Sequence, residues 1–208
     1  MASSNRRSVM TLFTSPDTPD CHRTRIVLAE KELSAEIIDL SEQPAPEDFH
    51  DLSPEGTVPV LADRDLVLTN ARVIMEYLDE RFPHPPLMPV DPVSRAKVRT
   101  ALYRIEKDWY GMLPDFERGE KTVARTRKQM REEILAAAPV FAAMPFFMSD
   151  EFSLADVTLG ALLWYLPKYG VELSGKNAKP IHDYMDRVFN RPTFQQSLTE
   201  VEREMRGG

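Results

Sequence analysis

The first part of the chain alternates between short apolar runs and a segment that favours helix. Residues 9–13 (VMTLF) form an apolar strand candidate, and residues 35–40 form a second one. A helix-favouring run that includes residues 26–28 and ends near Lys31 lies between them. The order strand, helix, strand predicts a right-handed crossover between two parallel strands.

The next apolar positions predict a hairpin and then a helix. The runs 58–62 and 66–68 flank a turn-like Asp-Arg-Asp sequence, which indicates two antiparallel strands. Apolar residues then recur at the spacing of one helical face: Val73, Ile74, Tyr77 and Leu78. Residues 1–82 are therefore predicted to form a small α/β domain.

Residues 92–208 keep a helical period throughout, which predicts an all-α domain. Two apolar stripes give its first core faces: Leu102, Ile105, Trp109 and Met112, then Met130, Ile134, Ala137 and Phe141. Pro114 and Gly119 predict a break between these helices, and Pro139 predicts a kink or an end.

The start of one later helix can be placed from its capping residues. Ser153 can cap the N-terminus, and Asp156 can bond back to the backbone N–H of the cap. Pro167 is expected to end this helix, and two shorter helices are predicted near residues 180–189 and 192–205.

Residues 83–91 form a proline-rich linker between the two predicted domains. Because proline fixes φ and restricts the residue before it, the segment is expected to be stiff and extended. A stiff segment loses little entropy on binding, so Pro83, His84 and Pro85 are a candidate docking surface, with Phe82 as an apolar base. From composition alone, a plain spacer with a solvated histidine is the favoured interpretation.

Charge and cysteine content exclude or disfavour several kinds of binding site. The formal charge of −7 makes direct binding to nucleic acid an unfavoured hypothesis. The single cysteine, Cys21, excludes an intramolecular disulfide and a cysteine-rich zinc site. Met1–Arg7 is polar, with no apolar signal core, and no apolar run approaches the length of about 20 residues that spans a bilayer. We therefore expect a cytoplasmic protein without membrane partners.

The order of elements resembles that of the glutathione transferase family. The resemblance covers nearly the whole chain and implies a thioredoxin-like N-terminal domain followed by an all-α domain. Val58-Pro59 looks like the cis-proline dipeptide of that family, and residues 152–156 (FSLAD) look like its helix cap. The cis bond is implied by the resemblance alone.

The residues that would hold glutathione differ from the family pattern. Thr18 stands where thioredoxin-like relatives have a nucleophilic cysteine, and a hydroxyl cannot form a mixed disulfide. Asn70 and Ala71 stand where the family has an acidic or amide residue and a serine, which removes contacts worth about 1.5–3 kcal/mol each. We interpret Cys21 as a packed small residue. Thr18, Val58, Pro59, Asn70 and Ala71 are thus vestigial glutathione positions, with no catalytic residue, metal or cofactor expected.

Longer runs resemble the bacterial stringent starvation protein A family. They include residues 25–31, 74–90, 104–110, 148–154 and 197–206. The resemblance implies a homodimer that associates with RNA polymerase holoenzyme and its sigma factor, acts in the starvation or stress response and lacks ordinary transferase activity. It also implies docking through Pro83, His84 and Pro85. Because histidine changes charge between about pH 5 and 8, such docking is expected to depend on pH.

Two other functions remain open from the sequence. One is a glutathione-dependent transferase or thiol reductase that uses Thr18 or Ser15, with Val58 and Pro59 at the ligand backbone. The other is a structural subunit of a larger heteromer, which would use its helical face and would not need the Pro-His-Pro residues.

Overall fold

The structure is a computed structural model that describes residues 7–207. Of the polar start Met1–Arg7, which we expected to lack a signal segment, all but Arg7 lies outside the described residues. No helix among residues 7–207 is long and apolar enough to cross a membrane.

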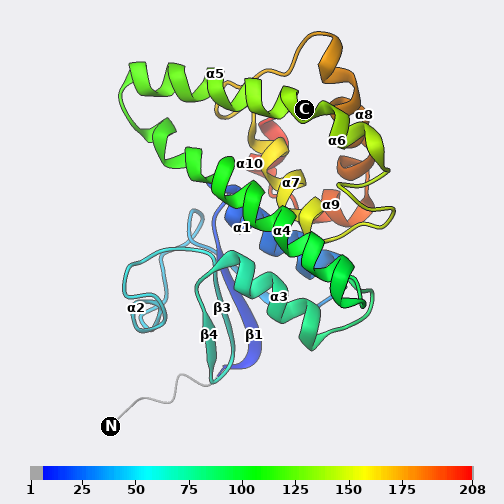
Figure 1. Ribbon diagram of the computed structural model, residues 1–208. Helices are drawn as coiled ribbons and strands as arrows, with labels where there is room; N and C mark the ends of the chain where they lie inside the picture. Colours follow the sequence, from blue (N-terminus) through cyan, green and yellow to red (C-terminus); the bar gives the residue numbers. More distant parts are fainter. Residues whose placement is uncertain (1–6, 208) are drawn as a thin grey trace.

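A mixed β-sheet forms the centre of the first part of the described chain (Figure 1). Its strand order is β2-β1-β3-β4, with β2 parallel to β1 and the other pairs antiparallel. The strands are β1 (Arg7–Thr14), β2 (Glu36–Asp39), β3 (Val60–Arg64) and β4 (Leu66–Leu68). The predicted parallel pairing of the first two strands and the predicted antiparallel hairpin are both confirmed.

Helices cover both faces of this sheet because successive side chains of a strand point to opposite sides. On one face, Leu12 and Leu61 pack in the main core with α1 (Pro19–Glu30) and α3 (Ala71–Arg81). On the other, Phe13, Ile38 and Val60 pack against Phe49 and Leu52 of α2 (Phe49–Leu52). The sequence did not predict α2, since a single turn carries too little periodicity.

The predicted inner face of α3 needs one correction. Ile74 and Leu78 are buried as expected, but Val73 is 49% exposed and Tyr77 is only half-buried. Ala71 and Met75 complete the buried face instead. The helix is therefore rotated relative to the face that the four apolar residues predicted.

The second part of the chain is helical, as predicted. The α-helices are α4 (Pro92–Asp108), α5 (Glu120–Ala136), α6 (Ala138–Ala143), α7 (Leu154–Tyr165), α8 (Lys179–Phe189), α9 (Pro192–Ser197) and α10 (Glu200–Glu204). Two 3₁₀ segments, Tyr110–Glu117 and Lys176–Ala178, complete it. The fold thus combines a thioredoxin-like part with an all-α part; the boundaries 1–82, 83–91 and 92–208 stay predictions.

Both predicted apolar stripes cross a helix end. Trp109 caps α4, so Met112 lies in the following 3₁₀ segment and is only half-buried. Ala137 separates α5 from α6, which carries Phe141. Pro139 lies in the first turn of α6, where its missing N–H costs no hydrogen bond.

The helix predicted near residues 192–205 is two helices. Leu198 has extended backbone angles, which end α9. Thr199 and Glu202 then form a capping box that starts α10. The sequence prediction missed this second capping pair within an apparently continuous helical pattern.

Helix α7 runs through the middle of the helical part, and all of its side chains are buried. Its start is the capping box predicted from Ser153 and Asp156. Asp156 also accepts hydrogen bonds from the Phe147 N–H (2.8 Å) and the Tyr184 hydroxyl (2.7 Å). Despite these bonds, burial raises the pKa of Asp156 to about 6.

We predict that Asp156→Asn lowers the free energy of unfolding at pH 7 by about 1–3 kcal/mol, because an amide offers one acceptor oxygen where the carboxylate uses two. Chemical denaturation measures this. Asp183→Asn, at a solvated carboxylate paired with Lys179 on α8, is the control and is expected to change stability by less than about 0.5 kcal/mol. Equal effects of the two substitutions would contradict the prediction.

Candidate functional site

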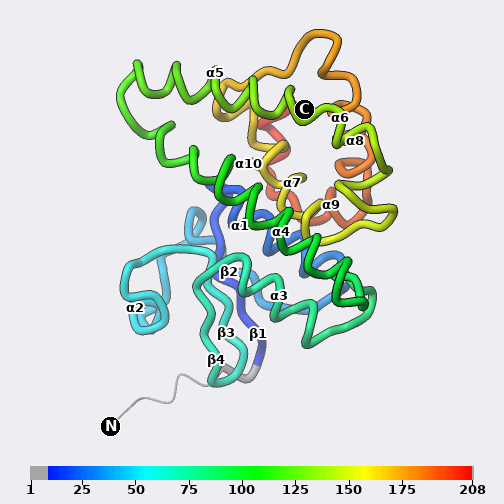
Figure 2. The backbone as a smooth tube through the Cα atoms, in the orientation of Figure 1, coloured from blue at the N-terminus to red at the C-terminus, as the bar shows by residue number. Residues whose placement is uncertain are grey.

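The residues predicted to dock a partner lie in the connection from α3 to α4, at the lower right of Figure 2. Residues 83–86 are all exposed, and we call Pro83, His84 and Pro85 the Pro-His-Pro segment. Phe82 before it is half-buried against the main core, and Leu87 and Met88 after it are buried. The segment therefore projects into solvent between two anchored ends.

A buried ion pair supports this segment from below. The ammonium group of Lys31 donates to the Asp79 carboxylate (2.6 Å), to the carbonyl oxygen of Phe82 (2.8 Å) and to that of Pro85. Asp79 also accepts from the Leu87 N–H at 2.8 Å. The Lys31 side chain is 0% exposed and that of Asp79 is 7% exposed. All three donors of the ammonium group are used, and two of them fix the backbone on either side of His84.

A further backbone hydrogen bond joins Leu87, two residues after the Pro-His-Pro segment, to the helical part. The Leu154 N–H at the start of α7 donates to the Leu87 carbonyl oxygen at 2.9 Å. The predicted docking surface thus lies where α1, α3 and α7 meet. The peptide bonds before Pro59 and Pro85 are cis, and the first of these was expected from the family resemblance.

A cleft of about 430 Å³ opens beside the first turn of α1, toward the helical part. Thr18 and Asp20 line it from α1, and Tyr110, Phe116 and Tyr169 supply aromatic walls from the helical part. Of the five vestigial glutathione positions, the cleft lining includes only Thr18. The structure therefore does not gather those positions around this cleft.

The polar atoms of these positions have structural partners. The Thr18 hydroxyl caps α1 by accepting from the Cys21 N–H (3.2 Å), and the Asn70 side chain caps α3 by accepting from the Val73 N–H (3.2 Å). Pro59 and Ala71 are buried and Val58 is half-buried. Each cap stabilises a helix by about 1 kcal/mol, which accounts for these residues without a ligand.

Ser15 and Cys21 also have local roles. The Ser15 hydroxyl donates to the Asp17 carboxylate (2.9 Å) and accepts from the Asp17 N–H (3.0 Å). Cys21 is fully buried, and burial raises the pKa of its thiol, so the protonated form dominates at neutral pH. This supports the interpretation of Cys21 as a packed small residue.

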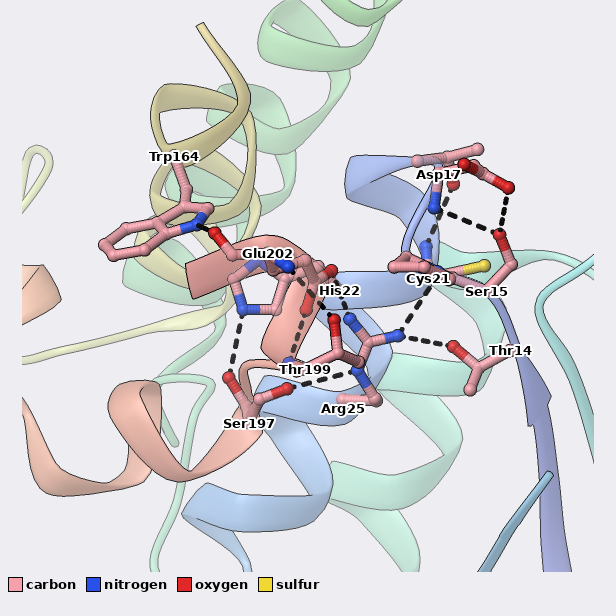
Figure 3. A network of polar contacts seen from close by, with 12 residues as sticks. Thr14, Ser15, Asp17, Cys21, His22, Arg25, Trp164, Ser197, Thr199 and Glu202 are labelled. Carbon is pink, nitrogen blue, oxygen red and sulfur yellow. Dashed lines mark hydrogen bonds and ion pairs between the residues drawn. The ribbon is translucent and has the colours of Figure 1, made fainter. Parts of the chain in front are cut away.

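Below the first turn of α1, a buried polar network joins α1 to the end of the chain (Figure 3). Arg25 forms an ion pair with Glu202 of α10, and their side chains are 4% and 0% exposed. Arg25 also donates to the Thr14 hydroxyl (2.5 Å) and the Ser197 carbonyl oxygen (3.1 Å). Burial opposes ionisation of Glu202, but electrostatic interactions with His22 and Arg25 and hydrogen bonds from Thr199 and Tyr165 outweigh it, so the pKa of Glu202 is lowered.

His22 is the neutral member of this network. Its Nε2 lies 3.0 Å from the Ser197 hydroxyl oxygen, whose own hydrogen is donated to the Phe194 carbonyl oxygen at 2.7 Å. Ser197 must then accept from His22, which places the proton on Nε2. Nδ1 is buried and has no partner among the described residues. Burial lowers the pKa of His22 to about 3, so it stays uncharged at neutral pH.

This lowered pKa predicts an acid-labile contribution to stability. The unfolded state gains a proton at His22 as pH falls through about 6.5, while the folded state does not, so stability is lost between that pH and the folded pKa of about 3. We expect the destabilisation caused by His22→Gln to be about 2 kcal/mol smaller at pH 5 than at pH 7.

Urea denaturation at both pH values tests this. His182→Gln, at an exposed histidine of α8, is the control and should show the same small effect at each pH. A His22→Gln effect that does not change with pH would contradict a neutral His22.

Lys31 and Asp79 are the site residues that the sequence did not predict. The helical spacing of α3 could have indicated Asp79. This residue falls on the buried face of the helix, four residues after Met75, where an apolar residue is expected. A carboxylate at such a position indicates a buried partner. The sequence gives no comparable signal that Lys31 is that partner.

Comparison with known proteins places this arrangement in a family. The family model for the glutathione S-transferase N-terminal domain matches residues 12–86, and the model for the C-terminal domain matches residues 101–192. The stringent starvation protein A homolog of Haemophilus influenzae is 54% identical over 201 residues, which cover 96% of this chain and 95% of that protein. The chain belongs to the stringent starvation protein A family.

The stringent starvation protein A homolog of Coxiella burnetii is a more distant member, 44% identical over 97% of both chains. Solved structures show the same fold at low identity. The bacterial glutathione transferase BphK has a TM-score of 0.81 at 21% identity, over 93% of this chain and 99% of that one. The theta class enzyme of Xanthomonas axonopodis has a TM-score of 0.79 at 20% identity, over 92% and 97%. The expected glutathione transferase-like fold is confirmed.

Proposed function

We propose that this chain is an RNA polymerase-associated regulator of transcription that acts in the starvation or stress response. The Pro-His-Pro segment, with Phe82 at its base, docks on the polymerase holoenzyme at its sigma factor. The relatives' name, stringent starvation protein A homolog, supports the stress role.

The observation that carries the proposal is the contrast between the segment and its base. Residues 83–86 are exposed in succession, while Lys31 and Asp79 beneath them are buried and hydrogen-bonded to the backbone at Phe82, Pro85 and Leu87. A surface held in one conformation before binding loses little entropy when the partner arrives. Such a support is expected for a docking element.

The proposal includes no enzymatic role and no cofactor. Thr18 and Asn70 serve as helix caps, and Ala71 is buried without a polar group to offer a ligand. A glutathione-dependent enzyme that uses Thr18 or Ser15 is the second candidate, and the cleft of about 430 Å³ beside Thr18 is the observation that favours it.

We further propose a cytoplasmic homodimer that reaches DNA only through the polymerase. The formal charge of −7 disfavours direct contact with phosphate groups and suits a partner with basic surface. The glutathione transferase-like fold supports the dimer.

The test is a binding titration of purified RNA polymerase holoenzyme against the native protein and the variant Pro83→Ala/His84→Ala/Pro85→Ala. We expect the native protein to bind and the variant to lose affinity by about tenfold or more, because a few central residues carry most of the energy of an interface. Circular dichroism checks that both fold. Absence of binding by the native protein, together with turnover of a generic electrophile with glutathione, would favour the enzyme.

A further inference from the structure

The charge of the chain is unevenly placed. Residues 32–63 hold nine of the 33 Asp and Glu residues and none of the 26 Lys and Arg residues. The rest of the chain therefore has a slight excess of positive charge. The acidic stretch runs from the end of α1 through β2 and α2 to β3, and Figure 2 shows its α2 portion on the left, away from the α3–α4 connection.

Most carboxylates of this stretch face solvent without a cation. Six are exposed: Glu32, Glu36, Glu42, Glu47, Asp51 and Glu55. Within residues 7–207, no Lys or Arg forms an ion pair with any of these six. Their repulsion is uncompensated inside the chain, so an external cation is the matching partner.

The acidic stretch contains β2, whose outer side is not paired with another described strand. β2 is an edge strand, and its one neighbour among the described strands is β1. No backbone hydrogen bond joins Glu36, Ile37 or Ile38 to a described residue outside that pairing. β2 lacks the lysines and prolines that commonly protect an edge strand, so it can accept one more strand.

An apolar groove lies beside this edge. It measures about 450 Å³. Its apolar lining comes from Leu28, Ala29, Leu33 and Ile37, and its polar lining includes Glu32, Gln196 and Arg25, whose charge is paired with Glu202. Ile37 is 50% exposed, although it lies in the sheet beside Leu12, which is fully buried. The edge thus combines free backbone groups, a hollow for an apolar side chain and acidic residues.

We propose that the β2 edge and this groove dock an extended, Lys- and Arg-rich segment of a partner protein. The segment adds a strand beside residues 36–38, places an aliphatic side chain over Ile37 and directs its basic side chains toward Glu32 and Glu36. In strand addition, main-chain hydrogen bonds supply affinity and alternate side chains supply specificity. Nucleic acid is repelled by the same carboxylates. The residues of this surface are not those of the Pro-His-Pro segment, and the inference does not rest on the function proposed for that segment.

The test uses synthetic ten-residue peptides of alternating Lys and Val, labelled for fluorescence anisotropy at low ionic strength. The native protein is expected to bind this peptide and to show no binding of an alternating Glu-Val peptide. A Lys-Val peptide that is N-methylated at alternate residues keeps its charge but cannot pair as a strand, and we expect it to bind at least about tenfold more weakly.

Two variants locate the site: Ile37→Ser, and Glu32→Lys/Glu36→Lys. Each is expected to weaken binding of the Lys-Val peptide by about fivefold or more. The matched control is Glu132→Lys/Glu172→Lys, which makes the same charge change at exposed positions outside the stretch and should bind like the native protein.

The Pro-His-Pro triple variant should also bind the Lys-Val peptide like the native protein, which separates this proposal from the one above. Absence of binding would overturn the inference, as would equal binding of the N-methylated peptide or equal loss in the control variant. A concentration-dependent self-association that excludes the peptide would also overturn it, since a second copy would then cover the edge.

Discussion

Glu202→Gln is expected to lower the free energy of unfolding by about 3–5 kcal/mol, because it leaves the buried Arg25 charge without its counter-charge. Glutamine keeps the shape of the side chain but removes its charge, and it offers one acceptor oxygen where the carboxylate uses two. Glu202 is fully buried, and its carboxylate also accepts hydrogen bonds from the Tyr165 hydroxyl and the Thr199 N–H. The substitution should therefore loosen α10 from α1 as well as destabilise the whole chain.

Denaturation by urea, followed by circular dichroism, measures the loss. Glu200→Gln is the matched control, since it makes the same change two residues away on an exposed position of α10. We expect the control to stay within about 0.5 kcal/mol of the native protein. A Glu202→Gln effect of the same small size would show that the Arg25 pair adds nothing to stability.

Lys31→Met is expected to have a comparable effect on stability and a second effect on docking. It removes the cation that pairs with Asp79 and frees the carbonyl oxygens of Phe82 and Pro85. Breaking a buried ion pair from one side costs about 3–5 kcal/mol. Because the Pro-His-Pro segment then lacks its support, we expect affinity for holoenzyme to fall several-fold although residues 82–85 are unchanged.

Both quantities are measured at a temperature where the variant remains folded. Lys128→Met is the control, because Lys128 is an exposed lysine of α5 that pairs with Glu132 at 3.8 Å. It should match the native protein in both assays. Full holoenzyme affinity in folded Lys31→Met would mean that the support beneath the segment does not matter for docking.

The positions that the family resemblance assigns to glutathione have structural roles in this fold. Thr18 and Asn70, at positions that the family resemblance assigns to glutathione binding, are here the N-caps of α1 and α3. These caps keep α1 and α3 in place against the sheet. Fold alone does not determine function, so the same fold can present a protein-binding surface. In the function proposed above, that surface is the Pro-His-Pro segment together with the buried residues that support it.

The sequence predicted the elements with strong local signals. The Asp-Arg-Asp turn placed the β3–β4 hairpin, and Ser153 with Asp156 placed the start of α7. Two errors arose where local signals were weak: the single turn of α2 and the split of α9 from α10 at Leu198. A third, the exposure of Val73, arose because packing decides which face of a helix is buried. Rotation of a helix by a fraction of a turn depends on its neighbours, which periodicity does not describe.

The sequence predicted the exposed residues of the candidate site but not the buried residues that support them. Prolines around His84 are visible in the sequence because they restrict the backbone directly. The Lys31–Asp79 pair joins residues 48 positions apart, and the Arg25–Glu202 pair joins residues 177 apart. Such pairings depend on the tertiary fold, so no spacing rule along the chain could identify them.

The central claim is that docking depends on the Pro-His-Pro segment and not on the cleft beside Thr18. The most direct measurement is the affinity of RNA polymerase holoenzyme for three proteins in parallel: the native chain, Pro83→Ala/His84→Ala/Pro85→Ala, and Thr18→Ser/Lys168→Ala. The last of these changes two residues that line the cleft. We expect the segment variant to lose at least about tenfold in affinity and the cleft variant to match the native chain. Loss in the cleft variant with full binding by the segment variant would contradict it.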